Sequence, residues 1–397
     1  MIIGTKYVLE EYCKYVYYSG AGNFWYDTSF EESIKYKLYH YISFSIYLIM
    51  ILLENLAALF VDFPEVEKKS AVMFSAIHDI ILLKTYFLLF YKSSIKILNC
   101  EMASAMEEIE KENVMKQQKL RVQWGIIFYA VTVYLSLIAY GVESLRKVLV
   151  EGTPFYTVVT YIPDYYDESI IANALRIFFY MTWLYMMLPM MATDCMPIVH
   201  LITMAHKFKT LRHYFEDIRV EFDENLTIMG TEPAANLLTA RFLNGVTMHH
   251  KLMFLAEEIN RVFGIIMSLQ VCESSAVAVL LLLRLALSSH LNLTNAFMTY
   301  TFVGSLFYLL ALNLWNAGEI TYEASLLSNS MFYSGWHLCQ LNKHPHKDIR
   351  RLVLVGCAQA QKPLILKAFG IQDLSYSTFV SVARMTYSIF AVFYQRN

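Results

Sequence analysis

A line of small and polar side chains runs along the last apolar stretch of the chain, residues 374–394. Its members are spaced four or three residues apart and therefore share one face of a helix: Ser377, Ser381, Arg384, Ser388, Ala391 and Gln395. In a membrane helix such a stripe either packs against a neighbouring helix or faces water. The arginine favours water or a partner, because a lone charge in lipid is costly. The stripe therefore predicts either close helix packing or the wall of an aqueous pore.

Motifs for covalent, metal or phosphate chemistry do not accompany this stripe. The sequence has neither a phosphate-binding glycine loop nor a G-x-S-x-G nucleophile elbow. His337, His344 and His346 lie close together around Pro345, but no second cluster of Cys or His supplies the other ligands of a zinc site. The net charge of -2 gives no general attraction to nucleic acid. We therefore expect no catalytic residue, metal, cofactor or nucleic-acid partner.

Long apolar stretches must position the stripe. Hydrophobic residues make up 57% of the chain and charged residues only 17%, which indicates a membrane protein rather than a soluble domain. Seven stretches are long enough to cross a bilayer, at 41–61, 71–91, 124–142, 171–205, 263–289, 295–315 and 374–394. The fourth is too long for one crossing and should continue beyond the membrane, bent near Pro189 and Pro197. The predicted fold is an all-α, polytopic membrane protein with seven transmembrane helices.

The 32 Lys and Arg residues are divided unevenly between the two sides of these spans. With the N-terminus inside, the outer segments carry only Lys68, Lys69, Arg146, Lys147, Arg176 and Arg396. Lys84, Arg284 and Arg384 lie within spans, where Lys84 either reaches the inner interface or pairs across helices. Because Lys and Arg favour cytoplasmic loops, the N-terminus is predicted to be cytosolic and the C-terminus extracellular. This orientation is the reverse of that of a G-protein-coupled receptor.

Amphipathic segments on the inner side are expected to extend the bundle into the cytosol. They occur in residues 92–123, 206–262 and 318–371, and Thr231-Glu232-Pro233 is typical of a helix start. Their apolar faces need partners outside the bilayer. We therefore predict a cytosolic helical anchor domain used in assembly, with packing inside one chain as the alternative.

The resulting division of the chain has three parts. Residues 1–317 hold the N-terminal segment and spans one to six, 318–371 an anchor helix region, and 372–397 the last span. On the outer side, residues 144–169 are rich in aromatic side chains and contain Pro154 and Pro163. They form either an ordered lid or a belt of aromatic rings at the membrane interface.

The C-terminal eighty residues or so resemble the insect odorant receptor family. The resemblance begins with Gly318-Glu319, Ser325, Tyr333 and Trp336 after the sixth span. It continues through Arg350-Arg351, Ala360-Gln361-Lys362-Pro363, Ala368-Phe369-Gly370, Leu374-Ser375, Phe379 and Thr386-Tyr387-Ser388. The seven spans and their inverted orientation agree with the same family along the whole chain.

The resemblance implies an odorant-gated, nonselective cation channel of four subunits in the plasma membrane of olfactory sensory neurons. Its partners would be olfactory coreceptor subunits in a heterotetramer, a small volatile odorant, the lipid bilayer and permeant cations. The long insertion of the coreceptor in inner loop 2 is missing from residues 206–262, which favours an odorant-tuning subunit. A homotetrameric odorant-gated channel and a seven-span G-protein-coupled chemoreceptor are the alternatives.

Candidate site residues follow from the resemblance and the orientation together. The family's odorant site lies in the outer half of the bundle, where the spans offer Phe74, Ile77, His78, Ile81, Ser136, Tyr140, Phe179, Tyr180, Trp183, Met298 and Tyr300. Matching Thr386-Tyr387 places the gate at Phe390 and Tyr394, with Gln395 close to the mouth. The family often has aliphatic residues at these gate positions. Phe390 and Tyr394 lie beside the polar stripe of Arg384, Ser388 and Ala391, so the face that lines the pore stays open.

Overall fold

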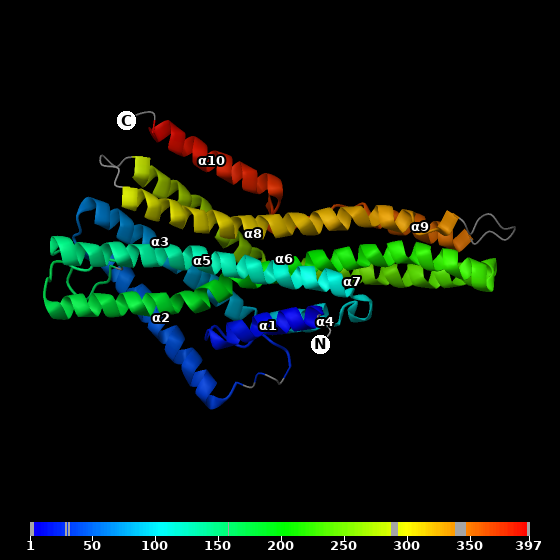
Figure 1. Cartoon of the computed structure of the whole chain (residues 1–397), viewed down its shortest axis with the longest axis horizontal. Helices are drawn as coiled ribbons and strands as arrows, with labels where there is room; N and C mark the ends of the chain where they lie inside the picture. Colours follow the sequence, from blue (N-terminus) through cyan, green and yellow to red (C-terminus); the bar gives the residue numbers. More distant parts are fainter. Residues whose placement is uncertain are drawn as a thin grey trace.

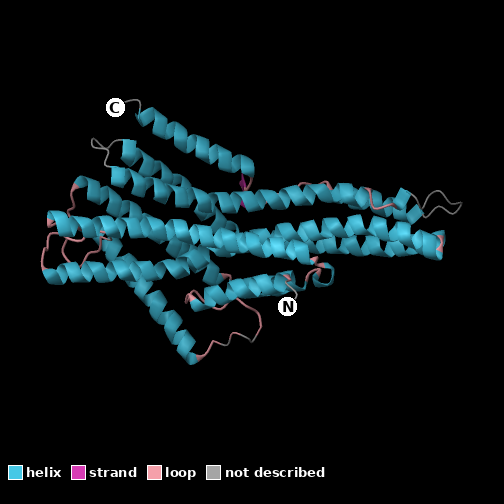
Figure 2. Ribbon diagram, viewed as in Figure 1, coloured by secondary structure: helices cyan, strands magenta, loops and turns pink. Residues whose placement is uncertain are grey.

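The computed structural model describes residues 4–27, 30, 32–157, 159–286, 293–337 and 347–394, which form an elongated bundle of helices (Figure 1). The elements in chain order are α1 (Thr5–Tyr18), α2 (Ile34–Phe60), α3 (Glu65–Phe90), α4 (Lys92–Ser104), the 3-10 turn η1 (Glu107–Ile109), α5 (Glu112–Glu151), α6 (Ile170–Met229), α7 (Thr231–Ala286), α8 (Leu293–Phe332), α9 (Lys347–Ala360), β1 (Lys367–Ala368), β2 (Gln372–Asp373) and α10 (Tyr376–Tyr394). The two short strands pair antiparallel directly before α10 (Figure 2). The all-α prediction is confirmed.

Over its described residues, each predicted span lies almost entirely within a helix. Within the described ranges, six helices are long and apolar enough to cross a membrane, namely α2, α3 and α5 to α8. The seventh predicted span is α10, which has 19 residues. Large apolar side chains such as Leu52, Leu59, Ile127 and Ile138 point out from α2 and α5. Exposed apolar side chains of this size are unfavourable in water and favourable against lipid tails, so this end of the bundle suits a membrane.

Helix α6 continues far beyond a single crossing, as its sequence predicts. It has 60 residues and contains both Pro189 and Pro197. Helix α7 begins at Thr231, so only Gly230 separates it from α6. Gly230 has a φ of 83°, a conformation that glycine adopts without steric cost. The two helices therefore turn back tightly and extend side by side from one end of the bundle (Figure 1).

A large buried cluster holds this extended end together. It joins residues of α1 and α4, the second half of α6, the first half of α7, and parts of α8 and α9. Phe208, Phe215, Phe242, Leu327 and Val353 are among its fully buried members. These side chains lie in the segments 206–262 and 318–371, whose apolar faces need partners outside the bilayer. Within one chain, the partners are the other inner helices.

Helix α10 is anchored at its base and runs at an angle to α8 (Figure 1), with contacts to both α7 and α8. The hydroxyl of Tyr376 donates a 2.9 Å hydrogen bond to Glu319 Oε2 on α8. The ring of Tyr376 lies so close to Gly318 that a Cβ there would come within 2.9 Å of it. Glycine at 318 is therefore required for this contact. The strand pair adds a bond from the Phe369 backbone N–H to Ser268 Oγ on α7, at 2.7 Å.

Candidate ligand cavity and pore helix

A partly enclosed, mostly apolar cavity of about 190 Å³ lies between α2, α3, α5, α6, α7 and α8. Eight of the candidate odorant-binding residues line it together: Phe74, Ile77, His78, Ile81, Ser136, Tyr140, Tyr180 and Trp183. Its remaining walls include Val133, Met187, Met190, Phe302 and Leu306. A cavity of apolar and aromatic side chains with few polar groups is typical of a site for a small organic ligand.

Three candidate residues do not line this cavity. Phe179 packs, partly buried, against the apolar cluster beside it, and Met298 is buried at another place on α8. Tyr300 is 55% exposed on the outside of the bundle. These three residues were selected by the orientation of the spans, and their side chains point away from the cavity.

The middle of the cavity is built from stacked rings and one carboxyl. The His78 ring lies against the Trp183 ring at a centroid distance of 4.0 Å and an interplanar angle of 19°. His78 Nδ1 lies 2.6 Å from Glu54 Oε2, and Tyr47 meets Trp183 edge-on at 6.2 Å. These contacts from α2 and α3 fix the indole of α6 in one orientation. Glu54 was not among the residues selected from the sequence.

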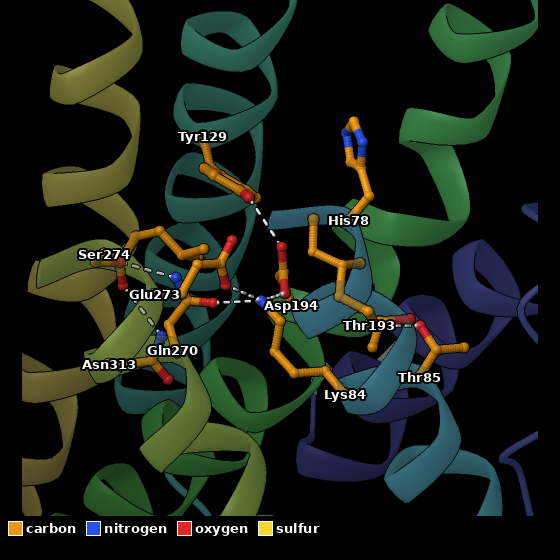
Figure 3. A network of polar contacts seen from close by, with 12 residues as sticks. His78, Lys84, Thr85, Tyr129, Thr193, Asp194, Gln270, Glu273, Ser274 and Asn313 are labelled. Atoms are coloured by element: carbon orange, nitrogen blue, oxygen red, sulfur yellow. Dashed lines mark hydrogen bonds and ion pairs between the residues drawn. The ribbon is translucent and has the colours of Figure 1, made fainter. Parts of the chain in front are cut away.

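The inner end of the cavity is closed by a buried ionic network (Figure 3). Lys84 Nζ lies 2.7 Å from each of three oxygens, on Asp194, Gln270 and Glu273. The hydroxyl of Tyr129 donates a 3.0 Å hydrogen bond to the other oxygen of Asp194. Lys84 is completely buried, and the two carboxylates are only 5% and 4% exposed. The network therefore joins α3, α5, α6 and α7. Of the two arrangements expected for Lys84, the structure shows pairing across helices.

The outer end is covered by residues 152–157 and 159–169, which fold on a single arginine of α6. Arg176 is 5% exposed, and its Nη2 donates to the backbone carbonyls of Asp164, Tyr165 and Asp167 at 2.8, 3.1 and 2.8 Å. The guanidinium also lies 5.2 Å from the centre of the Tyr156 ring. Thr157 and Val159 of this segment line the cavity. The segment therefore has the arrangement of an ordered lid.

The polar stripe of α10 points away from the helices of its own chain. The face that packs on the protein consists of Thr378, Val382 and Thr386, which are 9%, 6% and 1% exposed. Ser377, Ser381, Arg384 and Ser388 are exposed, and Phe390 and Ala391 are partly buried. None of the described carboxylates forms an ion pair with Arg384. Gln395 and the side chain of Tyr394 lie outside the described part of the chain.

Together, the spanning helices, the partly enclosed cavity and the lid define a polytopic helical membrane protein built to hold a small ligand. A model of the 7tm Odorant receptor family matches residues 70–387, and the chain belongs to this family. No curated protein matches the chain at a significant level. Among solved structures, the chain is similar to the insect olfactory receptor OR5 from Machilis hrabei in complex with eugenol, with 13% identity, 98% of both chains covered and a TM-score of 0.79. A second structure of the same receptor gives 12% identity, 98% coverage of both chains and a TM-score of 0.78. At this identity, the likeness establishes a shared fold.

Proposed function

We propose that the chain is the odorant-binding subunit of an odorant-gated, nonselective cation channel. The ligand would occupy the cavity between α3, α5, α6 and α8, which suits a small volatile molecule in size and polarity. The similar receptor whose structure contains eugenol supports a ligand of that size. The eight lining residues from Phe74 to Trp183 named above are the proposed contacts. The cell would be an olfactory sensory neuron, with the chain in its plasma membrane.

The single observation that carries the channel proposal is the rotation of α10. Its packing face is Thr378, Val382 and Thr386, so its serines and Arg384 are left for contacts outside the chain. Several copies of such a helix around one axis would enclose a polar path, where Arg384 finds the water that it requires. Arg384, Ser388 and Ala391 are the proposed lining, and Phe390, Tyr394 and Gln395 the proposed gate near the outer end.

Helix α7 is the proposed connection between the ligand and the pore. It carries Glu273 at the inner end of the cavity, and five residues earlier Ser268, which holds the strand pair at the base of α10. A ligand that binds better when α7 is in one of two positions would shift the population of open channels by that difference in affinity. No second messenger is required.

The inner helices are the proposed anchor for assembly. In this division, residues 1–317 bind the ligand, 206–262 and 318–371 contribute the anchor, and 372–397 line the pore. The charge distribution supports an anchor on the cytosolic side and a C-terminus outside. Gly230 alone joins α6 to α7, so this connection carries no long insertion. The absence of the insertion that the coreceptor has supports a tuning subunit paired with coreceptor subunits.

The test is co-expression of the chain with the olfactory coreceptor in a heterologous cell. We expect odorant-evoked cation currents that persist when G-protein signalling is blocked. Currents that vanish under the block would overturn the proposal in favour of a metabotropic receptor. The symmetry of particles of the chain purified alone would separate a homotetramer from an obligate heteromer.

A further inference from the structure

Three side-chain polar atoms on the cavity wall have no hydrogen-bond partner within the described residues: Thr157 Oγ1 in the segment that covers the outer end, and Ser136 Oγ and Trp183 Nε1 on the spanning helices, where burial is deepest. Ser136 is 1% exposed and Trp183 is 2% exposed, and both line the cavity. Within the described parts of the chain, neither Ser136 Oγ nor Trp183 Nε1 has a partner. Buried polar atoms in native proteins are nearly always paired, so each unpaired one requires an explanation.

The two groups lie at the same depth on facing helices. Helices α5 and α6 run antiparallel, with Tyr134 Oη donating to the Leu184 carbonyl at 3.1 Å and Tyr180 Oη to the Leu137 carbonyl at 3.0 Å. In this register, Ser136 lies opposite the residues just before Trp183, and at a rise of about 1.5 Å per residue the difference in depth is small. Both groups therefore meet the same section of the cavity.

A serine in a helix usually bonds to a carbonyl of the preceding turn, and another serine of the same cavity does so. Ser305 Oγ donates to the Phe302 carbonyl at 2.7 Å. Ser136 has no such bond, so its hydroxyl stays available to the cavity. The Trp183 indole cannot turn to find a protein acceptor, because the rings of His78 and Tyr47 hold it. The indole N–H of Trp183 and the hydroxyl of Ser136 are therefore both available for a ligand in the same section of the cavity.

We infer that the ligand of this receptor is an apolar molecule with one oxygen acceptor, such as an alcohol, a ketone or an ester. This oxygen accepts a hydrogen bond from the Trp183 N–H and forms a second hydrogen bond with the Ser136 hydroxyl. This inference rests on the proposed function. The indole N–H can only donate, so its complement is an oxygen with a lone pair and not an ammonium group. The apolar remainder of the ligand fills the space beside Phe74 and Phe302. A hydrocarbon of equal shape displaces solvent but leaves both polar groups unpaired, and sites of this kind reject such analogues strongly.

The test is a panel of volatile molecules in matched triplets, applied to cells that express the chain with the coreceptor. Each triplet keeps one carbon skeleton, for example acetophenone, ethylbenzene and 1-phenylethylamine. The readout is the ratio of half-maximal concentrations for the hydrocarbon and the oxygenated member. This ratio is insensitive to expression level, because both ligands act on the same receptors.

The variants are Trp183→Phe, which removes the N–H and keeps a ring, and Ser136→Ala. The control is Ser305→Ala, which removes a hydroxyl from the same cavity that is already bonded to a carbonyl. Wild type should favour the oxygenated members, and each test variant should lower the ratio by about 5- to 10-fold, as expected for one lost hydrogen bond in a buried site. Ser305→Ala should leave the ratio unchanged. Ser136→Ala keeps the inference testable if Trp183→Phe does not reach the cell surface.

Three results would overturn the inference and leave the channel proposal intact. They are equal potency of hydrocarbons and oxygenated members in wild type, a preference for the amines, and ratios unchanged in both variants. A different result would contradict the proposed function itself. If no molecule of the panel evokes current from receptors stained at the cell surface beside the coreceptor, the chain is not an odorant-gated subunit of that channel.

Discussion

Lys84 Nζ lies 2.7 Å from Asp194 Oδ1, and this ion pair joins α3 to α6 at the inner end of the ligand cavity. The same ammonium group lies 2.7 Å from Glu273 on α7, so one cation is the counter-charge of two buried carboxylates. Each of its three N–H donors has an acceptor, counting Gln270. A fully bonded buried charge is tolerable in a membrane helix, whereas an unpaired one is not.

Replacement of this cation should be the most damaging substitution in the membrane-spanning half. Lys84→Met leaves two buried carboxylates without a counter-charge, at a cost of about 3–5 kcal/mol. We expect little receptor at the cell surface and a lower midpoint of thermal unfolding in detergent. The triple variant Lys84→Met, Asp194→Asn, Glu273→Gln should recover part of the loss. The control is Lys111→Met, whose pair with Asp217 is about half exposed and contributes less than about 1 kcal/mol. Equal stability of the two single variants would contradict this account.

The lid segment should depend on one arginine. Arg176→Met removes the donor that the carbonyls of Asp164, Tyr165 and Asp167 share, so this part of the lid loses its common partner. We expect faster cleavage of this segment by an added protease, and a severalfold faster decay of current after odorant washout, because the cavity opens more readily. The control is Arg146→Met. Arg146 is 46% exposed and bonds Glu143 and Glu151 at the surface, so its loss should change neither rate. Protease resistance equal to wild type in Arg176→Met would show that the lid is held by other contacts.

The sequence predicts the helices well because their signals are local. Span lengths, the helix start at Thr231 and the continuation of α6 beyond the membrane all follow from short windows of residues. The partners of Lys84 do not. Asp79 is the nearest acid in the sequence, but it accepts a 2.9 Å hydrogen bond from Asn55 instead. The true partners Asp194 and Glu273 come from α6 and α7, and only packing of the whole bundle brings them to Lys84.

The sequence could indicate which half of each span to search for the cavity, but it could not give the rotation of each helix. The charge asymmetry selects one half of each span, and eight of the candidate cavity residues do line one cavity. Tyr300, which was selected by the same rule, points outward and is 55% exposed. Apolar side chains occur on every face of its helix in this part, between scattered Thr and Ser residues, so hydrophobic periodicity indicates no inward face. The same limit applies to α10, where packing on the protein separates the face of Thr386 from that of Ser388.

Acid should weaken the inner helices through a buried histidine. His206, on the part of α6 beyond the predicted membrane span, is 6% exposed, and burial lowers its pKa from 6.5 to about 4, with Arg121 and Lys209 acting in the same direction. Its bond to the Ile202 carbonyl and Glu319 oppose the shift. Because the unfolded chain binds a proton more readily, the stabilisation is complete above about pH 6.5 and is lost as the pH falls towards 4.

The measurement is the thermal midpoint of the purified receptor between pH 7 and pH 4. Wild type should lose at most about 3 kcal/mol through this group over that range. His206→Asn keeps a donor near the Ile202 carbonyl and cannot be protonated, so its midpoint should fall less steeply with acid. His213→Asn is the control, since His213 lies near the surface of the same helix beside Glu216. Identical slopes for His206→Asn and wild type would exclude His206 as a source of the acid sensitivity.

Thiol accessibility along α10 should separate its two faces. Thr386 is 1% exposed against the protein, whereas Ser388, two residues later, is exposed. If the outward face lines an aqueous pore, a cationic, membrane-impermeant thiol reagent applied outside should reach Ser388→Cys and reduce the odorant-evoked current irreversibly. Thr386→Cys should keep its current, because the reagent cannot enter the packed face. Wild type is the background control, since Cys100 and Cys272 are free and exposed. Block of Thr386→Cys with Ser388→Cys untouched would require a pore lined by the opposite face of α10, and block of neither would place the ion path outside this helix.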